Sequence, residues 1–161
     1  MDHDHAPTYF RRRICIIGDA AHAAMPFAGN GAAQAIEDGA VLNVLFQNLT
    51  SASDIPQVLE AYDTIRRPRS QKVVEIARDF GRLYGFAIPE YGDDPVKMKA
   101  FFGKNAAFTN NADLPGQNED AVKLFRELVA KKEEGKTGSE DKAEAVDASV
   151  RQVGSKVEVA A

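Results

Sequence analysis

The residues best suited to chemistry are a carboxylate and a glycine-rich turn near the start of the sequence. Asp19 follows the run Ile14-Cys15-Ile16-Ile17-Gly18, and the turn Gly29-Asn30-Gly31 opens a helical pattern. A carboxylate at the end of a strand can accept hydrogen bonds from ligand hydroxyls, and a helix N-terminus presents free N–H groups to electron-rich atoms. Together they predict a site for a polar ligand. Phosphate, nucleotide and flavin ligands all satisfy these features, although a P-loop is disfavoured because no Lys-Ser or Lys-Thr follows the glycines.

Five other polar residues have simpler structural explanations. His22 is interpreted as a packed, hydrogen-bonded histidine rather than a catalytic one. Glu37 and Asp38 are interpreted as helix-end electrostatics and local structure rather than an acid–base pair. Arg66 and Arg67 are expected to pair with carboxylates or to cap a helix rather than to touch a substrate. No catalytic residue is assigned.

The carboxylate and the turn must be positioned by a strand and a helix. Residues 13–17 predict a buried strand, and the small residues that follow, with Pro26, predict a loop. From Ala32 the spacing of Ile36, Ala40 and Val44 predicts a helix.

Further helices complete the expected architecture. Pro56 is tolerated in the first turn of the next helix, whereas Pro68 predicts a kink or a restart. Asp94-Pro95 opens a helix through Phe102, and another is expected from Asn118 to Lys132. The polar tail 133–161 and the short segment 1–7 are expected to be disordered. His3-Asp4-His5 lies in that segment, and no metal site is assigned to it.

Composition excludes several functions. The formal net charge of -4 argues against a nucleic-acid-binding surface. No secretory h-region begins the chain and no apolar stretch approaches the length of a membrane span, so a cytoplasmic protein without a membrane partner is expected. Cys15 is the only cysteine, which rules out an internal disulfide, and its apolar surroundings predict a core thiol.

Two separated motifs resemble those of the FAD-dependent aromatic-ring monooxygenases, in particular the salicylate hydroxylase-like group A flavoprotein hydroxylases. The second flavin-binding motif of that family has Gly-Asp, Ala-Ala-His, a proline, Gly-x-Gly and Gln-x-Ile-Glu-Asp in this order. This sequence matches it at Gly18-Asp19, Ala20-Ala21-His22, Pro26, Gly29-Asn30-Gly31 and Gln34-Ala35-Ile36-Glu37-Asp38. The later stretch from Tyr62 to Arg69 resembles the family's Tyr-x-x-x-Arg-Arg-Pro-Arg sequence, so the resemblance covers roughly residues 8–130.

The resemblance implies FAD as cofactor, NAD(P)H as reductant and an aromatic small molecule as substrate. It implies that Asp19 hydrogen-bonds the ribityl chain and that Pro26 lies beside the isoalloxazine ring. The remaining cofactor-binding positions face the pyrimidine edge of the flavin through their backbone, and they are Gly29, Asn30, Gly31 and Ala32.

The sequence also departs from the family's pattern. It contains no Gly-x-Gly-x-x-Gly fingerprint for the ADP half of FAD, and Phe27 stands where a second proline is usual. The expected fold is therefore an α/β remnant that is mainly α. Residues 8–132 would be the C-terminal part of the monooxygenase domain, with the last strand and helices of a Rossmann-like FAD-binding domain plus a C-terminal helical extension.

Two functions from different classes follow. The chain is either a fragment of a flavin monooxygenase that works with a missing N-terminal half, or a non-catalytic helical remnant or binding module that does not hold FAD alone. In both cases the isolated chain is not expected to be an active enzyme.

Overall fold

The computed structural model describes residues 4–135, which fall into a first unit ending at Phe125 and a second unit beginning at Arg126. In the second unit, residues 126–135 are helical. This helix therefore continues past residue 132, where the polar tail was expected to begin. The expected disorder of residues 136–161 lies outside the described residues, as does that of residues 1–3.

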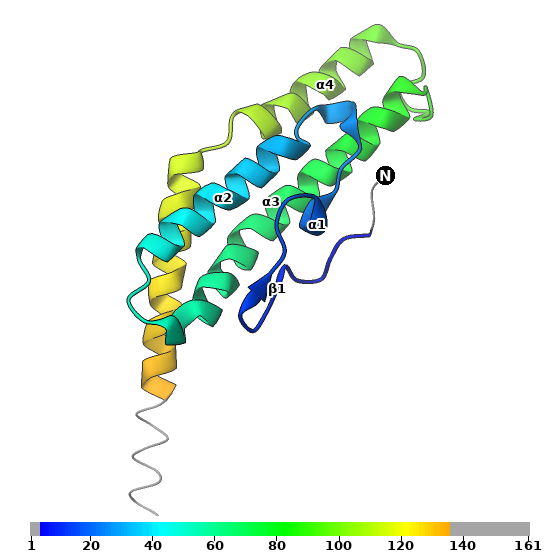
Figure 1. Cartoon of the computed structure of the whole chain (residues 1–161). Coiled ribbons are helices and arrows are strands. Elements are labelled where there is room, and N and C mark those ends of the chain that lie inside the picture. The colour runs from blue at the N-terminus through cyan, green and yellow to red at the C-terminus, as the bar shows by residue number, and fades with distance from the viewer. Residues whose placement is uncertain (1–3, 136–161) are drawn as a thin grey trace, which may run out of the picture. The chain divides into compact units, whose positions relative to one another are not determined.

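The first unit is built on two antiparallel helices, α2 (Gly31–Gln47) and α3 (Ile55–Tyr84), which lie side by side in Figure 1. A short link with the 3-10 turn η2 (Ala52–Asp54) joins them. The expected restart at Pro68 is wrong, because α3 continues through it as one helix of 30 residues. Buried side chains on both sides of Pro68 hold the two halves in place, so packing outweighs the missing N–H of the proline.

Two more helical segments follow α3. Helix α4 (Pro95–Asn110) begins at Asp94, whose side chain accepts hydrogen bonds from the backbone N–H groups of Val96 and Lys97. It extends beyond the predicted end at Phe102. Residues 114–125 are helical as well, and this segment is fastened by the buried side chains of Ala121 and Phe125.

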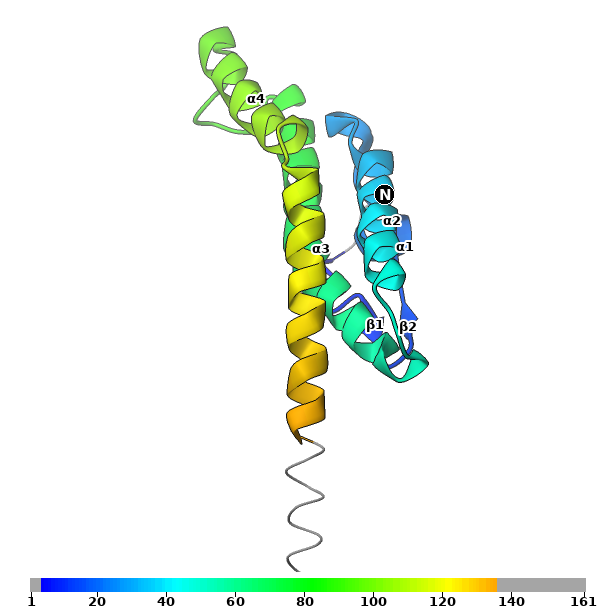
Figure 2. The same ribbon diagram turned by 90° about the vertical axis from the view of Figure 1, so that its left-hand side faces the viewer.

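The strand expected at residues 13–17 is present only as the two residues Ile14–Cys15, and its expected burial is wrong. The chain forms a small hairpin of β1 (Phe10–Arg11) and β2 (Ile14–Cys15), with Phe10 opposite Cys15, beside the N-terminal half of α3 (Figure 2). Ile14 is 75% exposed, Ile17 is 46% exposed and Cys15 is half-buried. The apolar pattern predicts a strand buried on both faces, but within residues 4–135 the sheet has two strands and leaves the side chains of Ile14 and Ile17 exposed.

The segment before the hairpin is held by α3, in contrast to the disorder expected for residues 4–7. The side chain of Gln71 donates a hydrogen bond to the carbonyl of Ala6, and the N–H of Tyr9 donates to Asp63 at 2.8 Å. The hydroxyl of Tyr62 also donates to the carbonyl of Ile16. Among residues 4–135, no helix is both apolar enough and long enough to cross a bilayer.

Candidate functional site

Asp19, whose carboxylate is predicted to bind a ligand, lies on a single helical turn, α1 (Asp19–His22). The turn begins after Gly18, whose φ of 57° and ψ of -139° belong to a region that L side chains avoid. The side chain of Asp19 is exposed and makes no hydrogen bond or ion pair with any residue in the range 4–135. Its carboxylate is therefore available to a ligand.

The second predicted feature is the start of α2. The 3-10 turn η1 (Pro26–Ala28) leads through Gly29, whose φ of 64° is left-handed, to Asn30. The side chain of Asn30 donates to the carbonyl of Ala28 and does not cap the helix. The first hydrogen bond along the α2 backbone runs from the N–H of Gln34 to the carbonyl of Asn30.

This geometry leaves the N–H groups of Gly31, Ala32 and Ala33 without an acceptor from residues 4–135. A helix N-terminus with free N–H groups attracts electron-rich atoms, because the helix dipole adds a partial positive charge there. Pro26, Gly29 and Ala32 are exposed, so this helix start is accessible.

Gly18 connects the turn that carries Asp19 to the helix α2. Its N–H donates a hydrogen bond to Asp38 of α2 at 3.0 Å. A Cβ atom at Gly18 would lie 3.4 Å from the Cβ of Ala35, one turn beyond the start of α2. The residue that precedes Asp19 is therefore packed directly against the helix whose N-terminus carries the free N–H groups.

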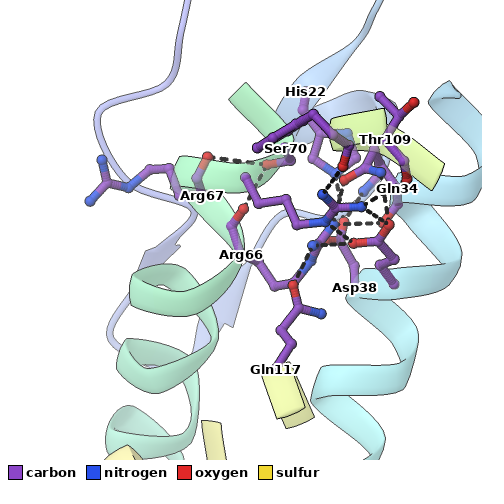
Figure 3. A network of polar contacts seen from close by, with 12 residues as sticks. His22, Gln34, Asp38, Arg66, Arg67, Ser70, Thr109 and Gln117 are labelled. Atoms are coloured by element: carbon purple, nitrogen blue, oxygen red, sulfur yellow. Dashed lines mark hydrogen bonds and ion pairs between the residues drawn. The ribbon is translucent and has the colours of Figure 1, made fainter. Parts of the chain in front are cut away.

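A buried polar network lies behind these residues, and Arg66 of α3 is at its centre (Figure 3). The Arg66 side chain is fully buried. It makes five hydrogen bonds, as many as a guanidinium has N–H donors. Their acceptors are Asp38 Oδ1 at 2.9 Å, Glu37 Oε2 at 2.6 Å, Gln117 Oε1 at 3.0 Å, Gln34 Oε1 at 2.9 Å and the Gln34 carbonyl at 3.2 Å.

Glu37 and Asp38, both on α2, balance the buried positive charge of Arg66. Glu37 also accepts hydrogen bonds from Arg69, and Asp38 accepts one from His22 at 2.6 Å. Burial alone raises the pKa of Asp38, but the hydrogen bonds from His22 and Gly18 and the charge of the network outweigh it and hold the pKa below its ordinary value. The pKa of Glu37 is lowered in the same way, with burial opposed by Arg69 and Arg66.

The structural explanations of the other polar residues are largely confirmed. His22 is buried and hydrogen-bonded, Arg66 pairs with two carboxylates, and Arg67 pairs with Asp63 at 2.9 Å. The helix-end interpretation of Glu37 and Asp38 is wrong, because both lie buried inside α2 and bind groups from other elements. The sequence does contain a signal for this buried network, namely the acidic pair Glu37-Asp38 in one helix and the arginines of the segment 66–69 in the next.

Phe27, which replaces the usual second proline, packs on α3. A Cβ atom at Gly81 would lie 2.6 Å from the Phe27 ring, so the glycine leaves the space that this ring occupies against the helix. The ring of Tyr84 is also near, with 6.0 Å between the two ring centroids. Phe27 thereby attaches the turn that contains Pro26 to α3. Residues 4–135 contain no group of three or more side chains suited to binding a metal ion.

Acid is expected to destabilise the fold through the α2 carboxylates. The pKa of Asp38 in the folded chain lies below the ordinary value of 3.8, so the unfolded chain takes up a proton first as the pH falls. The stability that this carboxylate contributes is complete above that value and is lost as the pH drops through the lowered pKa. Urea unfolding followed by circular dichroism at pH 7, 4 and 3 measures this loss. Asp38→Asn should make the dependence on pH shallower below pH 4, and an unchanged slope would contradict the assignment.

Comparisons with known proteins agree with the motifs. Residues 1–77 match the family described as an FAD binding domain. The chain is 41% identical over 131 residues to a 6-methylsalicylate 1-monooxygenase of Aspergillus terreus, covering 81% of this chain and 29% of the relative. It is 41% identical over 93 residues to a salicylate hydroxylase of Pseudomonas putida, covering 56% and 21%. A solved structure, a salicylate hydroxylase substrate complex, matches with a TM-score of 0.71 and 42% identity, covering 74% of this chain and 29% of that one.

Proposed function

We propose, from the premise that this chain is a partial FAD-dependent monooxygenase of the salicylate hydroxylase-like family, that residues 19–32 contact the flavin half of FAD. The observation that carries the proposal is the pairing of a free carboxylate with a free helix N-terminus. Within residues 4–135, the Asp19 carboxylate has no hydrogen-bond or ion-pair partner, and the first N–H groups of α2 have no acceptor.

These residues fit FAD chemically. The ribityl chain offers hydroxyl donors to the Asp19 carboxylate, and the pyrimidine edge offers acceptors to the backbone from Gly29 to Ala32. The pyrimidine edge gains negative charge on reduction, so the positive end of α2 stabilises the reduced form. When bound, FAD supplies the oxygen chemistry, whereas the protein supplies position and electrostatic field. Pro26 would lie beside the isoalloxazine ring, held there because Phe27 packs on Gly81.

The chain spans less than a third of the length of the relatives reported above. We therefore propose that the ADP half of FAD is held by an N-terminal half that lies outside this sequence, because no Gly-x-Gly-x-x-Gly fingerprint occurs within it. In that assembly, β2 would be the last strand of a Rossmann-like sheet. The exposed side chains of Ile14, Ile16 and Ile17 support this, because they form an apolar surface of the kind that a neighbouring strand or helix covers.

The substrate class follows from the relatives. Two of them are named for salicylate and for 6-methylsalicylate, so an aromatic substrate is proposed for the complete assembly, with NAD(P)H as reductant. The second candidate function is a helical binding module that does not hold FAD alone. The missing ADP fingerprint favours it, because the pyrophosphate contacts of that motif supply much of the affinity in a dinucleotide site.

Asp19→Ala is expected to weaken flavin binding about tenfold, which corresponds to about 1.4 kcal/mol for a lost charged hydrogen bond. Titration of riboflavin and of FAD against the chain, followed by flavin fluorescence, measures it. The two ligands should bind with similar affinity, because the proposed contacts involve only the flavin half that they share. Asp120→Ala, which removes an exposed carboxylate from the helix at residues 114–125, is the control and should change nothing.

Three outcomes of this titration are informative. Equal affinity of Asp19→Ala and the unaltered chain would reject the ribityl contact. Much tighter binding of FAD than of riboflavin would show an ADP contact that the proposal does not include. Absence of quenching by the unaltered chain at high micromolar protein would favour the binding-module function.

A further inference from the structure

We infer that Asp38 is the positioning residue of this site, which clamps both ends of the turn that carries Asp19. This inference rests on the proposed flavin contact. It assigns a role to a buried acidic residue that does not itself reach the exposed surface where the ligand would bind.

The clamp is a single carboxylate with three donors, two from the ends of the α1 turn and one from α3. Its Oδ2 atom accepts hydrogen bonds from the N–H of Gly18 at 3.0 Å and from Nε2 of His22 at 2.6 Å. Gly18 precedes α1 and His22 is its last residue, so the two contacts hold the turn at both ends. The Oδ1 atom accepts from Nε of Arg66 at 2.9 Å, which fixes the carboxylate from α3 (Figure 3).

Asp19 depends on this clamp because its side chain has no hydrogen bond or ion pair within residues 4–135. Its carboxylate is exposed and unpaired within residues 4–135, so its direction is set by the backbone of the turn. The free N–H groups lie at the start of α2, the helix that also carries Asp38. The Asp38 side chain therefore fixes the position of the Asp19 carboxylate relative to the free backbone N–H groups at the start of α2. Preorganisation of this kind reduces the entropy lost on binding.

An aspartate is required at this position because all three partners are donors. A carboxylate is an acceptor at both oxygens, whereas an asparagine of the same shape has one oxygen and one NH₂ group. In Asp38→Asn, the NH₂ group would face either Arg66 or the pair formed by Gly18 and His22. Whichever side it faces, an acceptor is lost and the hydrogen bonds lose their charge assistance.

The chain contains a matched control for this substitution. Asp63 of α3 is also a buried carboxylate that accepts one backbone N–H, from Tyr9 at 2.8 Å, and one arginine Nε, from Arg67 at 2.9 Å. It holds the segment before the hairpin, and its partners among residues 4–135 are Thr8, Tyr9 and Arg67, none of which belongs to α1. Asp63→Asn therefore removes a carboxylate of the same chemistry without loosening the Asp19 turn.

Amide hydrogen exchange of the full chain, resolved by NMR, tests the clamp directly. Asp38→Asn should speed exchange of the Gly18 amide more than tenfold and leave the Tyr9 amide unchanged, after correction for global stability from urea unfolding. Asp63→Asn should have the reverse effect. Equal acceleration at both amides in both variants would overturn the inference, because it would show only a general loss of stability.

Riboflavin titration then links the clamp to the site. Asp38→Asn should weaken binding about tenfold and Asp63→Asn should not. In an Asp19→Ala background, Asp38→Asn should have little further effect, since the group that it positions is gone. Full additivity of the two substitutions would overturn the positioning role. If the unaltered chain binds no flavin, the proposed function fails, while the exchange result still decides whether the clamp exists.

A second variant covers the case in which Asp38→Asn does not fold. His22→Phe keeps a ring of similar size and the ion pair of Asp38 with Arg66, but it releases one end of the turn. Exchange should accelerate at the amides of Ala21 and His22, which donate to the carbonyl of Gly18, and riboflavin affinity should fall. Unchanged exchange and unchanged affinity in this variant would overturn the inference.

Discussion

Arg66→Ala is expected to lower the free energy of unfolding by about 3–5 kcal/mol, the range found when one partner of a buried ion pair is removed. The side chain is fully buried and its five hydrogen bonds connect α2, α3 and the helix at residues 114–125. Its removal leaves Asp38 without an arginine. Glu37 keeps Arg69, so Asp38 becomes the less compensated of the two carboxylates. Urea unfolding followed by circular dichroism measures the change.

Arg67→Ala is the control for this prediction. Arg67 is the next residue along α3, but its side chain is one-third exposed and it pairs with Asp63 within the same helix. The exposure of Arg67 limits the contribution of the pair to about 1 kcal/mol, and the buried Asp63 keeps its hydrogen bonds from Thr8 and Tyr9, so the loss should be small. Similar losses for the two arginines would contradict the conclusion that burial and full hydrogen bonding distinguish Arg66.

Arg66→Lys separates the charge from the hydrogen bonds. A lysine keeps the positive charge but has three donors on one atom, so it cannot reach the acceptors that a planar guanidinium bridges. An intermediate loss is expected. A loss as large as that of alanine would mean that hydrogen-bond geometry, rather than charge, supports this network.

The helices could be predicted from the sequence because each carries its own local signals. The start of α2 follows from the glycine turn, and the start of α4 follows from Asp94-Pro95, where the Asp94 side chain caps the helix. The hairpin could not be predicted in the same way. The run from Ile14 to Ile17 has the composition of a buried strand. That composition is the same whether or not other elements cover the side chains, so it could not predict that they are exposed here.

The site was partly predictable for a similar reason. Asp19 and the turn from Gly29 to Gly31 are adjacent to element ends, and element ends are visible in a sequence. The role of Asp38 depends on three contacts from Gly18, His22 and Arg66, which lie 16 to 28 residues away along the chain. Helical periodicity alone gives no information on such contacts, and charge complementarity between α2 and α3 suggested only the pairing with arginine.

Gly18→Ala is expected to cost about 3 kcal/mol, the upper end of the range for a residue forced into a sparsely populated backbone region. At Gly18 the φ of 57° is combined with a ψ of -139°, which is outside the left-handed helical region that other residues tolerate. The new Cβ would lie 3.4 Å from the Cβ of Ala35, which is van der Waals contact, so the expected loss comes from the backbone conformation rather than from a clash.

Two other glycines of the site provide graded controls. Gly29 has a φ of 64° and a ψ of 15°, and a Cβ there meets no atom within 4 Å, so Gly29→Ala should cost only about 1–2 kcal/mol for left-handed backbone. Gly31 begins α2 without a positive φ and with open space around it, so Gly31→Ala should be neutral or slightly stabilising. Equal losses at Gly18 and Gly29 would contradict the extra cost assigned to the ψ of -139° at Gly18. The predicted order, Gly18 above Gly29 above Gly31, follows from the three backbone conformations, and it makes Gly18 the glycine on which the turn that carries Asp19 depends most.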